Sequence, residues 1–417
     1  MIPGLDRYKE AWQVESDREI KPGLHAMREA LLLLGQPHHN MPFVHLAGTN
    51  GKGSTLTFIE RIARSHGLKV GKFMSPCIVD VHDQIQINGE PIHPAQMDAL
   101  FKRMASAGLS GKLTDFELLT CTAFLHFLHE GVDLALIEAG MGGREDSTNV
   151  ILPIVSVIPS IALEHTNFLG DTLQSIAMHK AGIIKSGTPV VIGELPEEAK
   201  LIIEQEAAFQ NAELFAIHKH FCIEDETYSN NKTGLKISHL KRRMLGKHQG
   251  HNMAIAITAF LAIGEALQKR VSIDAIRSAV SCATVPGRFE EVLPQTFFDG
   301  AHNPASAAKL VDTLRESFPQ KDIHFVIGML RDKDVGAVLK HLEQVGTSYT
   351  FVDFSNERAM PAKTMLELSR SGNSRVTNDC LPYLLQPREE NELVVVTGSL
   401  YLLTELRTRL LDNKRNM

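Results

Sequence analysis

The chain has 417 residues, a length that predicts two or three domains, and its 43% apolar and 22% charged residues are typical of a globular protein. A formal net charge of −6 argues against bulk nucleic-acid binding, and no apolar run is long enough to span a membrane. The N-terminal residues lack a signal-peptide core and the five cysteines include no CxxC pair, so we expect a cytoplasmic protein without structural zinc.

Strand and helix patterns alternate through the first two-thirds of the chain. The predicted strands span residues 42–48, 68–73, 132–140, 154–162 and 188–193, and the predicted helices span 54–67, 114–131, 170–187, 251–268 and 272–280. This rhythm predicts an α/β fold: an N-terminal, P-loop-type, mostly parallel sheet with helices on both faces. In such sheets ligands bind beyond the carboxyl ends of the strands.

A second alternation follows a segment that contains two prolines and a glycine. That segment, ATVPGRFEEVLPQ at residues 283–295, predicts a linker. The strands predicted after it span 296–300, 322–330, 348–354 and 393–399, and the helices span 303–318, 334–345 and 400–411. We therefore expect a first domain over residues 1–290 and a smaller, Rossmann-like α/β domain over 291–417.

The segment HLAGTNGKGST, at residues 45–55, resembles a phosphate-binding loop with altered spacing. Gly53 follows Lys52 where the strict motif has Ser or Thr, and Leu46 takes the place of the first glycine. The segment still joins a predicted strand to a predicted helix, where backbone amides and the helix dipole favour an anion. A solvent-exposed turn is the alternative, and the context favours phosphate. The candidate ATP-binding residues of this loop are Gly48, Thr49, Asn50, Gly51, Lys52, Gly53, Ser54 and Thr55.

Several polar residues follow the strands next to this loop. Glu138 ends a buried strand, where a carboxylate can hold the Mg²⁺ of a bound nucleotide, and Asn149 lies in the glycine-rich segment after it. His165 follows the next strand and is either a third metal ligand or a structural residue, because Mg²⁺ prefers oxygen. Lys180 lies within a predicted helix, where a lysine usually extends its ammonium to water.

The second domain opens with DGAHNP. Asn303 and Pro304 predict a helix start, whereas Asp299 and His302 cluster at a strand's carboxyl end. Arg288, in the linker, either reaches toward phosphates or is an exposed charge. Taken alone, these residues predict a two-domain enzyme that uses Mg-ATP and leave the reaction class open.

Longer motifs narrow the class of reaction. The chain contains, in order, LLLLGQP, HLAGTNGKGST, SPCIVDVHDQIQINGE, TDFE, IEAGMGGREDSTNV, LEHTNFLGDTLQSIAMHKAGIIK, GKHQGHN, PGRFE, DGAHNP, GMLRDKD and TGSLYLL. Over nearly the whole chain these segments resemble the folylpolyglutamate synthase / dihydrofolate synthase family, cousins of the Mur peptidoglycan ligases. The resemblance implies an ATP-dependent amide ligase that activates a carboxylate of folate or dihydropteroate as an acyl phosphate, which L-glutamate then attacks.

The resemblance also implies a role for individual residues. It makes residues 1–290 an ATP-binding, Mur-ligase-like domain with a folate-side loop, and 291–417 a glutamate-ligase domain. The implied catalytic residues are Lys52, Lys180 (as a carbamate) and His302; the metal ligands are Ser75, Glu138 and His165; the nucleotide contacts outside the loop are Asn149, Arg288 and Asp299; and the glutamate side comprises His302 and Ser399.

Two departures fall in the folate-side loop. Cys77 stands where the family usually has His, and Asp83-Gln84 stand where it has Glu-Arg. We expect these differences to affect which folate the protein prefers. The alternatives are a Mur-type ligase acting on a UDP-muramyl substrate and a catalytically degenerate ATP-binding paralogue. Only about forty residues precede the loop strand, which disfavours the Mur type. We expect a monomer that binds no nucleic acid and no membrane.

Overall fold

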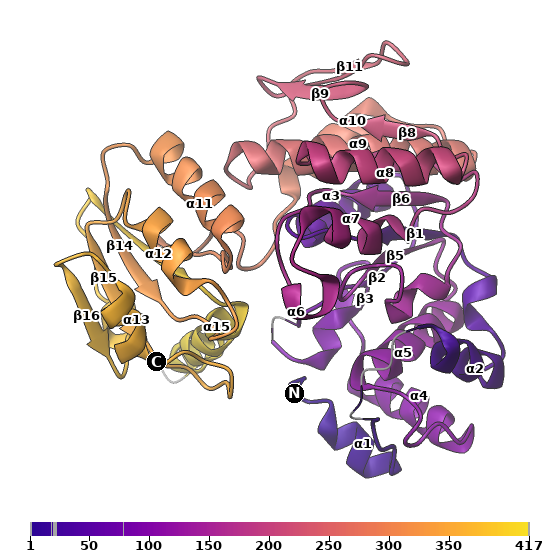
Figure 1. The fold of residues 1–417 in the computed structure, drawn as a ribbon, viewed down its shortest axis with the longest axis horizontal. Helices are drawn as coiled ribbons and strands as arrows, with labels where there is room; N and C mark the ends of the chain where they lie inside the picture. The colour runs from indigo at the N-terminus through magenta and orange to yellow at the C-terminus, as the bar shows by residue number, and fades with distance from the viewer. Residues whose placement is uncertain (1, 18, 20–22, 78, 416–417) are drawn as a thin grey trace. The chain divides into compact units, whose positions relative to one another are not determined.

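The chain forms two compact units in the computed structural model, which describes residues 2–415 except 18, 20–22 and 78 (Figure 1). The first unit comprises residues 1–242 and 250–283, and the second comprises 243–249 and 284–417. The ends of the predicted domains (residues 1 and 416–417) and residue 78 of the SPCIVDVHDQIQINGE motif lie outside the described residues. Each unit is described by itself below.

The first unit is built on a mostly parallel sheet with the strand order β4-β3-β2-β5-β1-β6-β7-β8. The strands from β2 to β8 in that order run parallel, and β3 and β4 extend one edge as antiparallel strands. A small antiparallel sheet, β11-β10-β9, follows in the chain. The strands are β1 (Phe43–Leu46), β2 (Val70–Phe73), β3 (Ile85–Ile87), β4 (Glu90–Pro91), β5 (Leu134–Glu138), β6 (Val155–Ile158), β7 (Val190–Ile192), β8 (Leu214–Ala216), β9 (Phe221–Glu224), β10 (Thr227–Asn230) and β11 (Lys236–Ile237).

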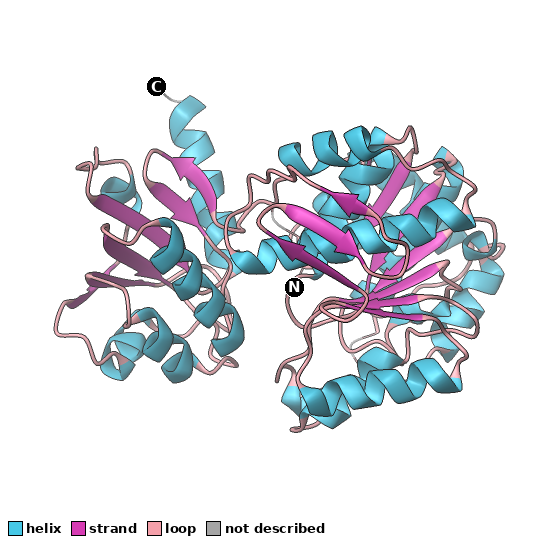
Figure 2. Cartoon of the chain, turned by 90° about the horizontal axis from the view of Figure 1, so that it is seen from above, coloured by secondary structure: helices cyan, strands magenta, loops and turns pink. Residues whose placement is uncertain are grey.

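Helices cover both faces of this sheet (Figure 2), and every residue of β1, β2, β5 and β6 is buried. The α-helices are α1 (Asp6–Trp12), α2 (His25–Leu33), α3 (Lys52–Ser65), α4 (Pro94–Ser106), α5 (Asp115–Glu130), α6 (Thr166–Leu169), α7 (Leu173–Ala181), α8 (Glu197–Phe209), α9 (Lys247–Ala266) and α10 (Ile273–Cys282). Short 3₁₀ helices span Pro37–His39, Val81–Gln84 and Ser147–Val150. The predicted parallel sheet with helices on both faces is confirmed.

Local signals in the sequence explain where key helices begin and end. Thr114 caps α5, because its side chain accepts from the Glu117 amide while the Glu117 carboxylate accepts from the Thr114 amide at 2.8 Å. Gly131 ends the same helix with a φ of 61°, in the left-handed region that favours glycine. In α11 (Pro304–Ser317) of the second unit, Asn303 caps the helix and Pro304 is its first residue, as predicted.

The second unit is a smaller α/β domain with the strand order β12-β13-β17-β14-β15-β16 (Figure 1, orange to yellow). Its strands are parallel except for β12, which forms an antiparallel hairpin with β13. The elements are β12 (Glu290–Leu293), β13 (Thr296–Phe298), β14 (Asp322–Ile327), β15 (Ser348–Val352), β16 (Ser374–Thr377), β17 (Glu392–Thr397), α11, α12 (Val335–Leu342), α13 (Ala362–Leu368), α14 (Leu381–Leu384) and α15 (Leu400–Arg415). The linker predicted over 283–295 is therefore wrong in part, since β12 lies within it.

Alternation along the strands of the second unit sends side chains into two cores. On β14, Phe325 and Ile327 pack with residues of α11, α12 and α13, whereas Val326 packs with residues of α14 and α15. Val395 and Val394 of β17 divide in the same way. Since successive strand residues point to opposite faces, a strand that is apolar throughout must be covered on both sides. No helix among the described residues is long and apolar enough to cross a membrane.

Candidate active site

The predicted phosphate loop joins β1 to α3 and is fixed to the segment that follows β6. The Ala47 amide donates to Val157 O at 3.1 Å, and the Thr49 amide donates to Ser160 O at 2.9 Å. The side chain of Ser160 accepts from the Asn50 amide at 2.9 Å and donates to Asn50 O at 2.9 Å. The loop is therefore held by backbone and side-chain bonds at the carboxyl edge of the sheet, where a ligand is expected.

Two glycines of the loop have no room for a side chain. Gly51, which immediately precedes α3, has a φ of 84°, and a Cβ on it would lie 2.6 Å from Asn252 Oδ1. A Cβ on Gly48 would lie 3.1 Å from the Pro159 ring and 3.2 Å from Ser160 O. Glycine is thus required at position 51 and favoured at position 48, where the backbone leads to the N-terminus of a helix of 14 residues, an arrangement that favours an anion.

Lys52 bends back over the loop. Its Nζ donates to Gly48 O at 2.6 Å and to Thr49 O at 3.3 Å, and lies 3.9 Å from Glu138 Oε1. Glu138 ends β5, beside β1, and its side chain is 5% exposed. The ammonium therefore lies between the loop carbonyls and a buried carboxylate, so it is positioned to move onto a phosphate.

Lys180 and Glu164 form a buried ion pair that sequence reasoning missed. Lys180 Nζ lies 2.7 Å from Glu164 Oε1, and the side chains are 1% and 11% exposed. Burial lowers the pKa of Lys180 to about 8, because the attraction of Glu164 offsets only part of the desolvation. Burial alone would raise the pKa of Glu164, but the charges of Lys180 and Lys52 lower it to about 2. Lys52 thus links this pair electrostatically to the phosphate loop.

Strand order places the predicted metal ligands at the same edge of the sheet. Ser75, Glu138 and His165 follow or end β2, β5 and β6, and these strands flank β1 in the order β2-β5-β1-β6. Ser75 is half-buried, and His165 is exposed, with a left-handed φ of 49° immediately before α6. The topology therefore brings the three residues to the loop's side of the sheet, and their role as ligands stays a prediction.

Asp146 organises the glycine-rich segment after β5. Its carboxylate accepts from the Met141 amide at 2.8 Å, from the Thr148 amide at 3.1 Å and from the Thr148 hydroxyl at 2.5 Å. Burial raises the pKa of Asp146 while these donors oppose the shift. Asn149, a predicted nucleotide contact, donates from Nδ2 to Arg144 O and to Gly182 O at 2.9 and 3.1 Å. It joins this segment to the end of α7, and contact with a nucleotide stays a prediction.

A cavity of about 410 Å³ opens beside this segment. Its lining combines aromatic and apolar side chains, such as Phe116, Met141 and Phe168, with the polar Ser75 and Asp146. Such a mixture is typical of a site for a small organic ligand. Ser75 is thus both a predicted metal ligand and a wall of this cavity.

In the second unit, four predicted site residues gather at the carboxyl ends of β13 and β17. Asp299 accepts from the Phe289 and Ala301 amides at 2.9 Å each; burial raises its pKa, and the charge of Arg288 opposes the shift. Ala301 O accepts from the Gly398 amide at 3.0 Å, which ties this turn to the TGS segment. His302 Nδ1 lies 2.8 Å from Gly300 O, and Ser399 Oγ accepts from the Tyr401 amide at 3.2 Å.

Both units match known protein families. Residues 46–260 match the model of the Mur ligase middle domain, and residues 289–410 match that of the dihydrofolate synthetase C-terminal domain. The chain is 35% identical over 410 residues to a Bacillus subtilis protein named dihydrofolate synthase/folylpolyglutamate synthase, covering 94% of this chain and 95% of that one. It is 32% identical over 415 residues to the folylpolyglutamate synthase of Lacticaseibacillus casei, covering 95% and 96%.

Solved structures agree with this likeness. Escherichia coli FolC in complex with DHPP and ADP superimposes with a TM-score of 0.89 at 29% identity, over 99% of this chain and 98% of that one. Mycobacterium tuberculosis folylpolyglutamate synthase complexed with ADP and AMPPCP gives a TM-score of 0.84 at 28% identity, over 93% and 95%. The similarity therefore extends over both units.

Proposed function

This chain belongs to the dihydrofolate synthase/folylpolyglutamate synthase family, and from that premise we propose that it is an ATP-dependent ligase that joins L-glutamate to a folate. The observation that carries the proposal is the cluster beside the phosphate loop. There, Lys52 lies 3.9 Å from the Glu138 carboxylate and acts electrostatically on the buried pair of Glu164 and Lys180. Alternating charges next to an anion-binding loop suit the transfer of a phosphoryl group.

The loop fits the phosphates of ATP. The missing side chains of Gly48 and Gly51 leave the backbone able to wrap an anion, and Lys52 supplies a mobile positive charge. Thr55 Oγ1 is buried and has no hydrogen-bond partner among the described residues, so a polar group of the ligand or its ion would satisfy it. We place the β- and γ-phosphates here and propose Asn149 as a further nucleotide contact; nucleotide contacts by Arg288 and Asp299 stay predictions from the family resemblance.

A Mg²⁺ ion fits the same edge of the sheet. The Glu138 carboxylate and Ser75 hydroxyl are oxygen donors of the kind Mg²⁺ prefers, and we propose His165 as the third ligand. When bound, the ion would neutralise charge on the β- and γ-phosphates. The other groups that would act on the phosphates are Lys52 and the backbone amides of the loop.

The proposed reaction has two steps. In the first step, a folate carboxylate attacks the γ-phosphorus and the bond from that phosphorus to the β–γ bridging oxygen breaks. ADP departs, and the folate carboxylate becomes an acyl phosphate. The amino group of L-glutamate then attacks the acyl carbon, and phosphate leaves as the amide forms. Lys52 and the loop amides would stabilise the charge of the transferring phosphoryl group. We assign His302 and Ser399 to the side of the reaction that receives glutamate.

We further propose that Lys180 acts as a carbamate. The lysine ammonium first loses one proton to solvent; the neutral amine then forms a bond to the carbon of CO₂ and releases a second proton, so the side-chain charge changes from +1 to −1. At a pKa of about 8, about a quarter of the amine is neutral at pH 7.5, against roughly one part in a thousand for an ordinary lysine. The negative carbamate would repel the Glu164 carboxylate. The carbamate and the ion pair between Lys180 and Glu164 therefore cannot exist at the same time.

We assign the folate, or dihydropteroate, to the cavity of about 410 Å³ beside the glycine-rich segment. Phe116 and Phe168 can stack on a flat ring system, and the cavity shares Ser75 with the proposed metal ligands. The first unit would thus supply the phosphate loop and the folate cavity, and the second would serve glutamate ligation. A monomeric state and a cytoplasmic location stay predictions.

An acceptor screen tests the proposal. Purified protein is incubated with ATP, Mg²⁺, L-glutamate and one acceptor at a time: dihydropteroate, tetrahydrofolate or a UDP-muramyl substrate. We expect phosphate release that requires glutamate and a pteroate or folate, with a product heavier by one glutamate residue in mass spectrometry. Comparing the two folate acceptors shows whether one or both ligase activities are present. ATP binding without turnover on any acceptor would indicate a degenerate paralogue instead.

A further inference from the structure

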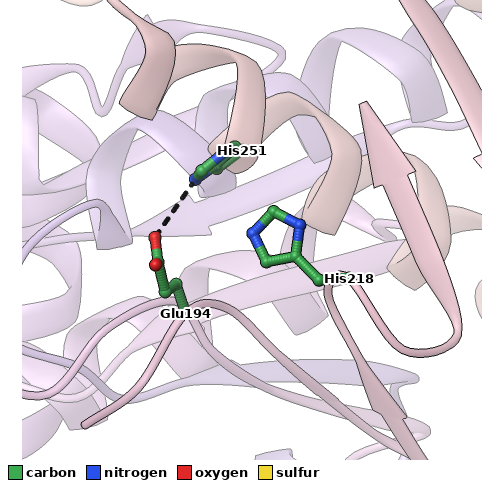
Figure 3. A group of neighbouring side chains, drawn as sticks. All are labelled: Glu194, His218 and His251. Carbon is green, nitrogen blue, oxygen red and sulfur yellow. Dashed lines mark ion pairs between the residues drawn. The ribbon is translucent and has the colours of Figure 1, made fainter. Parts of the chain in front are cut away.

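Two histidines and a glutamate converge on the surface of the first unit at a place that the proposed ligase chemistry does not use. The donor atoms of Glu194, His218 and His251 all lie within 4.8 Å of one another. Their side chains point into a common space in Figure 3, where the dashed line joins His251 Nδ1 to Glu194 Oε2 at 3.8 Å. The rings of His218 and His251 meet edge to face, with centroids 5.2 Å apart.

The sheet register brings two of these residues together. β7 pairs in parallel with β8, with Ile192 opposite Ala216, so Glu194 and His218 each follow the last paired residue by two positions. The turn that carries His218 is fixed by its own amide, which donates to Phe221 O at 2.7 Å. Its φ of 66° is a left-handed conformation that histidine adopts more readily than most residues.

Close backbone packing brings in the third residue. His251 lies near the start of α9, and Ile255, one turn further on, packs against Gly193. A Cβ on Gly193 would lie 2.0 Å from Pro159 O and 2.9 Å from the Ile255 side chain, so only glycine allows this approach. The separation between α9 and the end of β7 is thus set by packing.

Imidazole nitrogens with one carboxylate form a donor set typical of zinc. Tetrahedral donors bound at about 2.1 Å lie roughly 3.4 Å apart, so the observed separations need to close by about an ångström. The Glu194 side chain is 71% exposed and can rotate to do so. Mg²⁺ prefers oxygen donors, so this trio is chemically distinct from the proposed Mg²⁺ ligands.

We propose that Glu194, His218 and His251 bind a Zn²⁺ ion, or another divalent first-row transition ion, that cross-links the ends of β7 and β8 to α9. Three protein ligands leave a fourth position for water. The cysteine spacing predicts no structural zinc site built from cysteines. The proposed site contains no cysteine, so the two statements agree. The proposal does not depend on the ligase activity.

Metal binding to the full, untagged chain tests the proposal without nucleotide or folate. After treatment with a chelator, Zn²⁺ is titrated by calorimetry, and Co²⁺ is titrated by its visible absorption as a probe of geometry. We expect one Zn²⁺ bound by the wild type and lost in the double variant H218N/H251A, in which asparagine preserves the left-handed turn. E194Q should weaken binding by at least about tenfold, since even the loss of an outer-shell partner costs 10- to 100-fold.

Two further variants separate this site from others. H25A removes an exposed histidine that lies 3.3 Å from Glu29 and that belongs to no three-residue donor group among the described residues. This variant should bind Zn²⁺ as the wild type does. H165A should also retain the ion, because His165 belongs to the proposed Mg²⁺ ligands. Zn²⁺ binding that is absent in the wild type, unchanged in H218N/H251A, or lost in H165A instead would overturn the proposal.

Discussion

Replacing Glu164 by Gln removes the negative charge that faces Lys180. The two charged atoms lie 2.7 Å apart and the lysine side chain is 1% exposed, so water cannot replace the lost partner. Lys52 adds repulsion, since its charge lowers the pKa of Lys180 further. E164Q therefore leaves a buried ammonium whose desolvation is opposed mainly by the weaker attraction of Asp146.

Breaking a buried ion pair in this way typically costs about 3–5 kcal/mol. The cost has an upper limit, because Lys180 can lose its proton instead. Deprotonating a lysine of ordinary pKa 10.5 at pH 7 costs about 5 kcal/mol, which bounds the effect. Lys180→Met should cost less than E164Q, since Glu164 keeps the attraction of Lys52. The double variant E164Q/K180M should cost less than the sum of the two, because no unpaired charge remains.

Urea unfolding of the first unit, monitored in nucleotide-free buffer depleted of bicarbonate, gives the free energies for this cycle. A matched control is E206Q, which breaks the exposed Arg144–Glu206 pair at 2.8 Å in the same unit. That change should cost at most about 1 kcal/mol. If E164Q costs no more than E206Q, or if the double variant shows no coupling, the buried pair does not carry the energy assigned to it here.

Three other changes follow from the structure. Lys52→Met should lower kcat for phosphoryl transfer by about 100- to 1,000-fold or more in the acceptor assay, whereas a rate within a few-fold of wild type would contradict its role. His302→Ala should raise KM for glutamate with little change in KM for ATP, and equal changes in both would argue against a glutamate-side residue. Burial lowers the pKa of His45 to about 3. The unfolded chain therefore binds a proton on this histidine below about pH 6.5, whereas the folded chain does not. Stability should fall as the pH drops from 6.5 toward 3. His45→Gln, which can still bond Thr148, should flatten this slope in urea unfolding between pH 4 and 6, and an unchanged slope would refute the assignment.

The strand, loop and helix that carry the proposed phosphate site could be predicted from the sequence because their signal is local. A strand, three glycines with a lysine, and a helix follow one another within residues 43–65, and the groups offered to the ligand are mostly backbone amides. The position of Glu138 could be predicted for a similar reason, since it ends a continuous apolar strand, whereas its role as a metal ligand stays a prediction. The caps at Thr114 and Asn303 also depend only on residues within one turn. Such features need no knowledge of what lies across the sheet.

Short strands with weak alternation were harder to find. β12 has four residues, two of them glutamates, inside a segment rich in turn-forming residues, so the sequence pattern predicts a linker there. Its pairing with β13 is decided by tertiary contact: Phe289, immediately before it, stacks on Phe297 with centroids 4.7 Å apart. A propensity argument cannot weigh that contact, because the partner becomes a neighbour only once the hairpin has formed.

Side-chain clusters were missed for a further reason, which is that they depend on strand order. The helix pattern alone predicts that Lys180 reaches water, and only the family resemblance gives it a catalytic role, because its partner Glu164 lies 16 residues earlier in the loop before α6. The trio of Glu194, His218 and His251 likewise requires β7 beside β8 and α9 against Gly193. Strand order in this sheet follows the chain only in part, since β2 pairs with β5 and β1 lies between β5 and β6, so spacing along the sequence carries little information about which side chains meet. Local backbone features can therefore be predicted from a single sequence, whereas clusters of side chains from several segments require the fold.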